Sequence, residues 1–497
     1  MSQFERSSGV LLHLSSLPNE YGIGTLGKES YEFVDLLASM NQKIWQLCPV
    51  GPTGYGDSPY QCFSAFAGNP YFVSLEKLVE YNLLSEGDLP EKQPSACFID
   101  FGRLYNERFP LLYKAYENFR AGTSNLNANK VEFFQLQNRE WLDDYALFMA
   151  LKKEHGGKSW HEWEKDLRMR KSQTLDFFRD KLAYEIDFHG FIQFLFFEQW
   201  EKVKNYANSK GVKIVGDMPI YVASDSSDAW ANTEMFMFDE DRKPVKVAGV
   251  PPDYFSVTGQ LWGNPLYNWD KLKETNFKWW IDRCKAGLKL FDFLRVDHFR
   301  GFTGFWAVPF EEKTAIKGEW LPACGYELFT EIKNQLGVLP ILAEDLGVIT
   351  SDVEKLRDDF NFPGMRILQF AFDSAEPALN FLPHSYSFNS IVYTGTHDNQ
   401  TLLGWYRGAK ETDQAFARDY LNAKEETILK DFIRAATAST AVFSIIPMQD
   451  LLGCGDEARM NVPSVASGNW QWRFDFDNLS EEMFDFFKHI TELYSRV

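Results

Sequence analysis

Eight short apolar segments recur along the chain, and their spacing constrains the fold more than any other feature. Each segment is long enough for one buried strand, and most are separated from the next by a helical pattern or a longer insertion. They cover residues 9–14, 43–50, 212–217, 291–296, 340–344, 365–370, 390–396 and 440–446. Strands that alternate with helices predict an α/β fold, here a (β/α)8 TIM barrel. A doubly wound open sheet is the alternative, but no Gly-x-Gly-x-x-Gly motif follows the first segment.

The distances between the segments are uneven, which predicts insertions in a single barrel domain that spans residues 1–497. From about residue 68 to 205 the pattern is mainly helical and too long for a simple crossover, so an inserted helical subdomain is expected. Residues 218–275 are expected to form an insertion of loops that borders the mouth of the barrel. Further helical patterns cover residues 29–40, 104–120, 131–153, 174–204, 277–289, 324–336, 412–437 and 480–495.

Four acidic side chains stand at the C-terminal ends of these segments. They end or follow the third, fourth, fifth and seventh segments and are Asp217, Asp297, Glu344 and Asp398. In a barrel, the C-terminal strand ends form one ring around one pocket, which is where barrel active sites lie. An isolated Arg295-Val296-Asp297 sequence is more often a salt bridge than a site. Carboxylates at four strand ends instead predict a functional pocket.

A ring of carboxylates suits the cleavage of glycosidic bonds. A retaining mechanism needs one ionised carboxylate as nucleophile and one protonated carboxyl as acid, about 5–5.5 Å apart. Asp297 and Glu344 end neighbouring strands, which fits this distance. Arg295 is expected to keep Asp297 ionised, whereas apolar surroundings and other carboxylates are expected to raise the pKa of Glu344. His298 and His397 are suited to hydrogen bonds with sugar hydroxyls.

Two other classes of function fit part of the pattern. In metal-assisted hydrolysis, Asp297-His298 and His397-Asp398 hold a divalent cation, and EDTA abolishes activity. No H-x-H, H-E-x-x-H or D-x-D-x-D-G motif accompanies these residues. A non-enzymatic glucan-binding module uses aromatic side chains, which make up 16% of this chain, but it has no use for a ring of carboxylates.

Charge and cysteine usage restrict the partners and the compartment. The chain has 51 Lys and Arg against 70 Asp and Glu, a net charge of −19, which repels nucleic acid and anionic membranes and favours a neutral substrate. The six cysteines are scattered without a C-x-x-C pair, so neither a disulfide framework nor a zinc site is expected. No signal peptide and no run of 18 apolar residues is evident, which predicts a cytoplasmic protein.

Seven motifs together resemble the amylomaltases, also called 4-α-glucanotransferases or disproportionating enzymes, of the α-amylase superfamily. The resemblance extends from His13 to Trp470. The motifs are GYGDSPYQ (54–61), GDMPI (216–220), PDYF (252–255), WGNP (262–265), RVDHF (295–299), AEDLG (343–347) and THDN (396–399). The resemblance implies a barrel with inserted subdomains, no C-terminal β-sandwich, and no metal or other cofactor for catalysis.

The resemblance also implies roles for individual residues. Asp297 is the nucleophile that forms a covalent glucosyl-enzyme intermediate, and Glu344 is the general acid and base. Asp398 holds the 2- and 3-hydroxyls of the reacting glucose. Residues implied in substrate binding are Tyr55, Ser58, Asp217, Asp253, Trp262, Arg295, His298, His397 and Asn469.

The implied substrates are α-1,4-glucans, namely maltodextrin, amylose and glycogen-derived oligosaccharides, with glucose or maltose as acceptor. A hydrolytic enzyme of the α-glucosidase or α-amylase type is the alternative, because the residues alone do not say whether water or a sugar attacks the intermediate. Two positions depart from the family pattern. Ser464 stands where a glycine is expected, and Asp456 stands where a serine is commoner.

Overall fold

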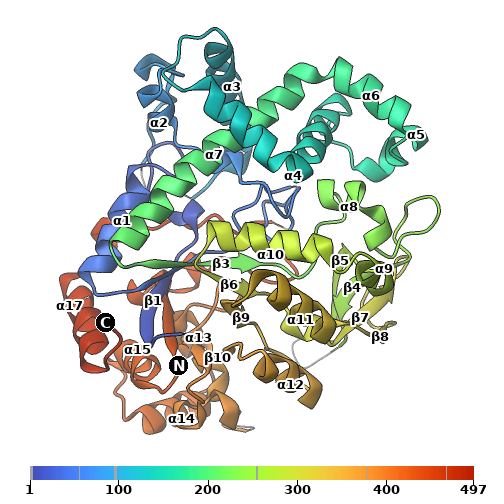
Figure 1. Cartoon of the computed structure of the whole chain (residues 1–497). Coiled ribbons are helices and arrows are strands. Elements are labelled where there is room, and N and C mark those ends of the chain that lie inside the picture. Colours follow the sequence, from blue (N-terminus) through green and yellow to red (C-terminus); the bar gives the residue numbers. More distant parts are fainter. Residues whose placement is uncertain (1–3, 55, 95–97, 253–255, 376–377, 466) are drawn as a thin grey trace.

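A closed barrel of eight parallel strands forms the centre of the molecule (Figure 1). The computed structural model describes residues 4–54, 56–94, 98–252, 256–375, 378–465 and 467–497. In order around the barrel, the strands are β1 (Ser7–Leu11), β2 (Ile44–Gln46), β3 (Lys213–Met218), β6 (Phe293–Val296), β9 (Ile341–Ala343), β10 (Gly364–Ile367), β11 (Ser390–Tyr393) and β12 (Phe443–Pro447). β12 pairs with β1, so this sheet has no open edge. The predicted (β/α)8 barrel is confirmed, and each predicted strand corresponds to one barrel strand.

The alternation of side chains along β6 explains how a charged residue comes to lie inside the barrel. Leu294 and Val296 are buried in the large core between the strands and the helices, whereas Phe293 packs into the separate cluster of the barrel interior. Because side chains alternate along a strand, Arg295 points to the same side as Phe293. The residues that fill the interior are Phe4, Leu11, Ile44, Val215, Leu342, Met365, Ile367, Ile391, Tyr393, Val442, Phe443 and Ile445.

Helices surround the barrel, and a helical insertion extends from one side (Figure 1). Around the barrel lie α1 (Lys28–Ser39), α10 (Lys278–Leu290), α11 (Gly325–Leu336), α12 (Ser351–Asp359), α13 (Leu402–Gly408), α14 (Glu411–Leu421), α15 (Ile428–Ala438), α16 (Met448–Leu451) and α17 (Glu481–Leu493). The chain between β2 and β3 contains α2 (Leu75–Glu80), α3 (Phe101–Arg120), α4 (Ala128–Glu154), α5 (Lys165–Arg168), α6 (Ser172–Lys181) and α7 (Ala183–Ser209). The long helix α7 returns the chain to the barrel.

Two of the expected helices are each divided into two. The pattern over residues 174–204 belongs to α6 and α7, which meet at Leu182. The pattern over residues 412–437 belongs to α14 and α15. Asn422 ends α14 with a φ of 51°, a left-handed conformation that stops a right-handed helix. Apolar periodicity continues across both breaks, so it does not reveal them.

A second, antiparallel sheet lies beside the barrel, and two of its four strands fall within residues 218–275, where the sequence predicts loops. Its strands, in spatial order, are β5 (Gln260–Pro265), β4 (Lys246–Val250), β7 (Gly304–Pro309) and β8 (Glu319–Pro322). The short helices α8 (Ser227–Ala231) and α9 (Trp269–Glu274) flank β4 and β5 in sequence. The strands are short and contain glycine and proline, and β4 pairs with β7 across the intervening β6. For these reasons the local pattern does not indicate a sheet.

Within the described residues, none of the helices has both the length and the apolar character needed to cross a bilayer. The cysteines in the same part of the chain are Cys48, Cys62, Cys284, Cys324 and Cys454, and all five are free.

Candidate active site

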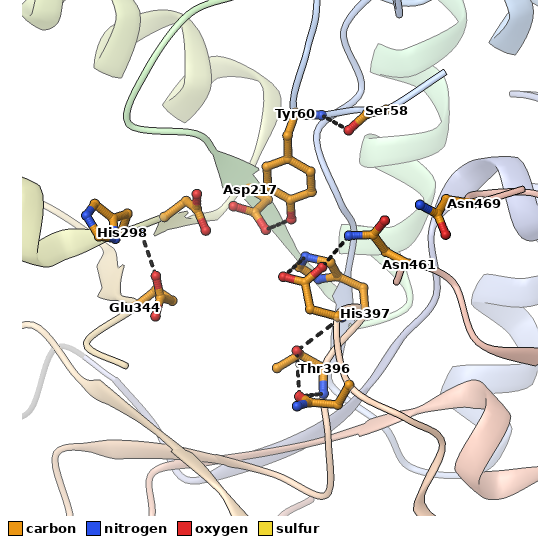
Figure 2. A network of polar contacts seen from close by, with 12 residues as sticks. Ser58, Tyr60, Asp217, His298, Glu344, Thr396, His397, Asn461 and Asn469 are labelled. Atoms are coloured by element: carbon orange, nitrogen blue, oxygen red, sulfur yellow. Dashed lines mark hydrogen bonds and ion pairs between the residues drawn. The ribbon is translucent and has the colours of Figure 1, made fainter. Parts of the chain in front are cut away.

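The predicted carboxylates gather at the end of the barrel where the parallel strands terminate. Asp217 lies near the end of β3, and Asp297 and Glu344 directly follow β6 and β9. Asp398 lies on the turn after β11. Figure 2 shows the side chains of Asp217, Glu344 and His397 directed toward a common region from these different elements. The strand ends of the barrel therefore bring together residues that are far apart in the sequence.

Arg295 is the central charge of this cluster and is only 4% exposed. Its Nη1 donates hydrogen bonds to Asp217 at 2.6 and 2.8 Å and to Asp297 at 3.1 Å. The register of the strands, which pairs Asp217 with Arg295, sets this contact. The Tyr60 hydroxyl donates to the second carboxylate oxygen of Asp217 at 2.8 Å. Burial alone lowers the pKa of Arg295, but Asp217 and Asp297 raise it well above its ordinary value, so this cation stays charged.

Glu344 is held by two backbone N–H groups. The amide of His298 donates to Oε2 at 2.7 Å, and the amide of Leu346 donates to Oε1 at 2.9 Å. His298 has a left-handed backbone, with φ 47° and ψ 53°. Burial and the nearby charge of Asp297 raise the pKa of Glu344 to about 8, despite the opposing effect of Arg295 and the two amides. The direction is the one expected from the sequence, and it keeps this carboxyl protonated near neutral pH.

Asp398 has the opposite electrostatic environment. Burial raises its pKa, but His397 and the side chain of Asn461 lower the pKa by more than burial raises it. The net pKa therefore lies below the ordinary value of an aspartate. Nδ2 of Asn461 donates to Oδ1 at 2.7 Å, and Nε2 of His397 lies 3.4 Å from Oδ2. Burial lowers the pKa of His397, but Asp398 raises it to a net value above the ordinary one. The site thus holds one protonated carboxyl and one firmly ionised carboxylate.

Aromatic rings flank these polar groups. The ring of Tyr60 stacks on His397, with ring centres 5.1 Å apart and planes at 21°. Trp470 lies 5.8 Å from Tyr60 and 5.7 Å from His397. Trp262, on β5 of the second sheet, meets His298 edge to face at 4.8 Å. Flat apolar faces beside hydrogen-bonding groups suit a ligand, such as a sugar, that has both apolar faces and hydroxyls.

A comparison with protein families decides the relationship that the motifs suggest. The family model described as 4-alpha-glucanotransferase matches residues 12–478. The chain belongs to the 4-α-glucanotransferase family. The resemblance seen in the sequence is therefore confirmed over most of the chain.

Members of the glucanotransferase family match this chain along nearly its whole length. The 4-alpha-glucanotransferase of Synechocystis sp. is 49% identical over 99% of this chain and 98% of its own length. That of Clostridium butyricum is 46% identical over 98% of this chain and 100% of its own length. The amylomaltase from Streptococcus agalactiae in complex with acarbose is 42% identical, with a TM-score of 0.96, and the alignment covers 99% of this chain and 100% of that one.

A more distant structure is similar in fold. The amylomaltase from Corynebacterium glutamicum is 18% identical to this chain, with a TM-score of 0.77 over 99% of this chain and 75% of that one. At this level of identity the similarity shows the fold alone.

The remaining residues that the glucanotransferase motifs imply lie around this cluster or outside the described residues. Oγ of Ser58 accepts a hydrogen bond from the amide of Tyr60 at 3.3 Å. Asn469 bonds to the backbone of Val462 and Val465 within its own loop, and Figure 2 shows it apart from Glu344 and Asp217. Tyr55 and Asp253 are among the residues that the structure does not describe. Among the residues that it does describe, no three His, Cys, Asp or Glu side chains are grouped as metal ligands.

Two residues of the site are absent from the predicted set. Tyr60 lies within the GYGDSPYQ motif, and its bond to Asp217 and its contact with His397 place it in the cluster. Asn461 lies where the family pattern changes, three residues before Ser464, and is bonded to Asp398. Tyr60 could be predicted from its motif. Asn461 could not, because its role depends on a contact between segments 63 positions apart.

Proposed function

We propose that this chain is a 4-α-glucanotransferase that moves a segment of an α-1,4-glucan to the 4-hydroxyl of an acceptor by retaining double displacement. One observation carries the proposed mechanism: a carboxyl whose pKa is about 8, Glu344, lies next to Asp297, a carboxylate bound to a buried arginine. Family membership supports the transferase activity over hydrolysis. The two charge states are those that an acid and a nucleophile need.

In the first proposed step, Asp297 attacks the anomeric carbon of the donor glucan. The bond between this carbon and the glycosidic oxygen breaks as the bond to the carboxylate oxygen of Asp297 forms. Glu344 gives its proton to the leaving oxygen, which becomes the 4-hydroxyl of the released fragment. Arg295 holds the attacking carboxylate by its 3.1 Å hydrogen bond.

In the second proposed step, the 4-hydroxyl of the acceptor attacks the same carbon from the side that the first fragment left. Glu344, now ionised, takes the proton of this hydroxyl, and Asp297 is released as a carboxylate. Both charges then return to their starting values, and the anomeric configuration is retained. The aromatic residues around the site support transfer by providing apolar faces for an acceptor sugar and by limiting access of water.

The other residues are proposed to bind and orient the sugars. Asp398 accepts hydrogen bonds from the 2- and 3-hydroxyls of the reacting glucose, assisted by His298 and His397. Asp217 acts mainly through its bonds to Arg295 and Tyr60, because its side chain is almost completely buried. Residues proposed to line the neighbouring sugar sites are Tyr55, Ser58, Asp253, Trp262 and Asn469. The proposed donors are maltodextrin, amylose and glycogen-derived oligosaccharides, and the proposed acceptors include glucose and maltose.

Incubation with maltotriose distinguishes transfer from hydrolysis. A transferase produces glucose together with longer maltodextrins, and the number of reducing ends stays constant because each bond broken is replaced by one bond formed. A steady rise in reducing ends would assign the site to a hydrolase. Chain lengths are followed by chromatography, and reducing ends by a colorimetric assay on the same samples.

Replacement of Asp297 by asparagine tests the proposed nucleophile. Asparagine has nearly the same shape but is a poor nucleophile, so Asp297→Asn is expected to lower kcat at least about a thousandfold. The melting temperature is measured alongside to show that the variant is folded. Asp270→Asn, at an exposed aspartate near the start of α9, is the matched control and is expected to keep full activity. Near-normal turnover in Asp297→Asn would exclude this residue as nucleophile.

A further inference from the structure

Residues 459–461, in the C-terminal part of the chain, form hydrogen bonds with Asp398. Nδ2 of Asn461 donates to Oδ1 at 2.7 Å, which occupies one oxygen, and Nε2 of His397 lies 3.4 Å from the other. Nη2 of Arg459 donates to the backbone carbonyl of Asp398 at 2.6 Å. Figure 2 shows Asn461 next to His397. The residue is thus held at its side chain and at its backbone by the same three-residue stretch.

This stretch is itself fixed to the turn that carries Asp398. The amide of Asn461 donates to the carbonyl of His397 at 3.1 Å. Nε of Arg459 donates to the carbonyl of Asn461 at 2.9 Å. The amide of Trp470 donates to the carbonyl of Met460 at 2.7 Å, which closes the loop between them. Because the backbone of Asn461 is anchored on both sides, its side-chain amide has little freedom to turn away from Asp398.

We propose that Asn461 is a positioning residue for the transfer reaction: its amide fixes the plane of the Asp398 carboxylate so that the carboxylate can accept the hydroxyls of the reacting glucose. The inference rests on the proposed role of Asp398. Asn461 acts through Asp398. Without this bond, Asp398 rotates about its side-chain torsions, and the hydroxyl contacts form at the cost of ordering the carboxylate in each turnover.

The electrostatics of the site support the same role. The ionisable groups that act on Asp398 are His397 of its own turn, Arg295 of β6 and the Cys48 thiol after β2. Burial raises the pKa of Asp398, and His397 and the Asn461 hydrogen bond lower it. Loss of Asn461 removes one of these two stabilising contacts, so the pKa of Asp398 rises. Because the pKa of Asp398 starts below its ordinary value, this carboxylate stays ionised without Asn461, and the loss affects its orientation rather than its charge.

The experiment compares Asn461→Ala and Asn461→Asp with the unaltered enzyme on maltotriose. Asn461→Ala removes the donor and is expected to lower kcat about 10- to 100-fold, the usual effect of losing a hydrogen bond to a charged group. The KM is expected to change less than kcat, because the bond orients a group that acts mainly in the transition state. Asn461→Asp keeps the shape but places a second carboxylate beside Asp398. It is expected to shift the acidic limb of kcat/KM toward high pH, because like charges side by side raise the pKa of one of the two carboxyl groups.

Asp456→Ser is the matched control within the same segment. Asp456 accepts a hydrogen bond from Gln400 at 2.6 Å and so holds the same turn, but it makes no hydrogen bond to Asp398. The control is expected to keep kcat within about twofold and to leave the pH profile unchanged, since it removes only an exposed contact. Melting temperatures are recorded for every variant, and kcat is referred to the folded fraction.

Two results would overturn the inference. One is an Asn461→Ala enzyme with kcat within twofold of normal. The other is an Asp456→Ser enzyme that loses as much activity as Asn461→Ala, because loop shape would then explain both. Asp398→Asn is measured in parallel. If this variant is active, or if the unaltered enzyme does not transfer, the proposed function fails. If the unaltered enzyme transfers, Asp398→Asn is inactive and Asn461→Ala keeps a normal kcat, the inference about Asn461 fails and the proposed function stands.

Discussion

At the scale of single residues, the position of Glu344 in the barrel makes loss of its carboxyl proton unfavourable. Burial is the largest cause of the raised pKa, and the charge of Asp297 adds to it. The two backbone amides that bind its oxygens favour the ionised form but do not outweigh these effects. A proton held in this way is available to a leaving group at neutral pH, and the proposed acid step is lost above the pKa of about 8.

The same pKa makes the stability of the protein depend on pH. The folded chain keeps the Glu344 proton up to a pH of about 8, whereas an unfolded glutamic acid releases it near its ordinary pKa of 4.5. The stability that this proton contributes is fully present below 4.5 and is lost as the pH rises to about 8. In Glu344→Gln this decline is absent. The melting temperature of the variant, relative to the unaltered protein, is therefore expected to rise by about 2 °C or more between pH 5 and pH 9.

Calorimetry at matched ionic strength measures this difference at several pH values. The change of the difference with pH is the quantity that matters, because an amide side chain accepts fewer hydrogen bonds than a carboxylate and the substitution therefore carries a constant cost. Glu162→Gln, at an exposed glutamate of the helical insertion, is the control and is expected to show a constant offset. A pH-independent difference for Glu344→Gln would show that the carboxyl is ionised in the folded protein.

The residues of the site differ in how far the sequence reveals them. Asp297 and Glu344 could be predicted because each directly follows an apolar strand, and a barrel brings neighbouring strand ends together. Asn461 could not be predicted in this way, since its contact with Asp398 depends on how the chain after β12 folds back over the turn after β11. Local patterns determine strands and their ends, whereas contacts between loops depend on the path of the whole chain.

At the scale of secondary structure elements, the second sheet positions Trp262 against the site. β5 carries Trp262 and is the outer strand, and β4 joins it to β7. The sequence does not predict the strands of this sheet, because they are short and their pairing crosses β6 in sequence. The barrel strands, by contrast, stand out as apolar runs, since both faces of a parallel barrel strand are buried.

Gly249 is a position where β4 lies very close to the strand that carries Trp262. A Cβ added to Gly249 would lie 2.6 Å from the carbonyl oxygen of Gln260 on β5. Gly249→Ala is therefore expected to push β5 outward, to cost about 1–3 kcal/mol of stability, and to raise KM for maltotriose about threefold to tenfold as Trp262 moves. Steady-state kinetics and thermal unfolding measure the two effects.

Gly304→Ala is the matched control in the same sheet. A Cβ added to Gly304 on β7 would meet the carbonyl oxygen of Leu321 at 3.4 Å, which is an ordinary contact. This variant is expected to bind maltotriose normally. Equal KM values for the Gly249 and Gly304 variants would show that the sugar contacts do not depend on the position of β5.

At the scale of the whole molecule, the site depends on a barrel that is closed by its first and last strands. β1 and β12 pair along five residues, from Ser7 with Phe443 to Leu11 with Pro447. Arg496 stabilises the pairing of β1 with β12 at the end of the barrel opposite the carboxylates. The side chain is fully buried and donates to the backbone carbonyls of Ser7, Thr437, Ser439, Ala441 and Val442. These carbonyls belong to the start of β1, the end of α15 and the segment that leads into β12.

Replacement of Arg496 separates the stability of the barrel from the chemistry at its other end. Arg496→Met keeps much of the volume but removes one donor from each of the five carbonyls, so a loss of about 3 kcal/mol is expected, or about 3 °C in Tm for a chain of this length. Below the transition, kcat on maltotriose is expected to stay unchanged, because the proposed catalytic residues lie at the other strand ends. Lys430→Met, which removes a surface pair with Glu482 between α15 and α17, is the control and is expected to shift Tm by less than about 1 °C. If Arg496→Met lowered kcat while Tm stayed constant, the two ends of the barrel would be coupled in function, and the closing seam would have to be treated as part of the catalytic apparatus.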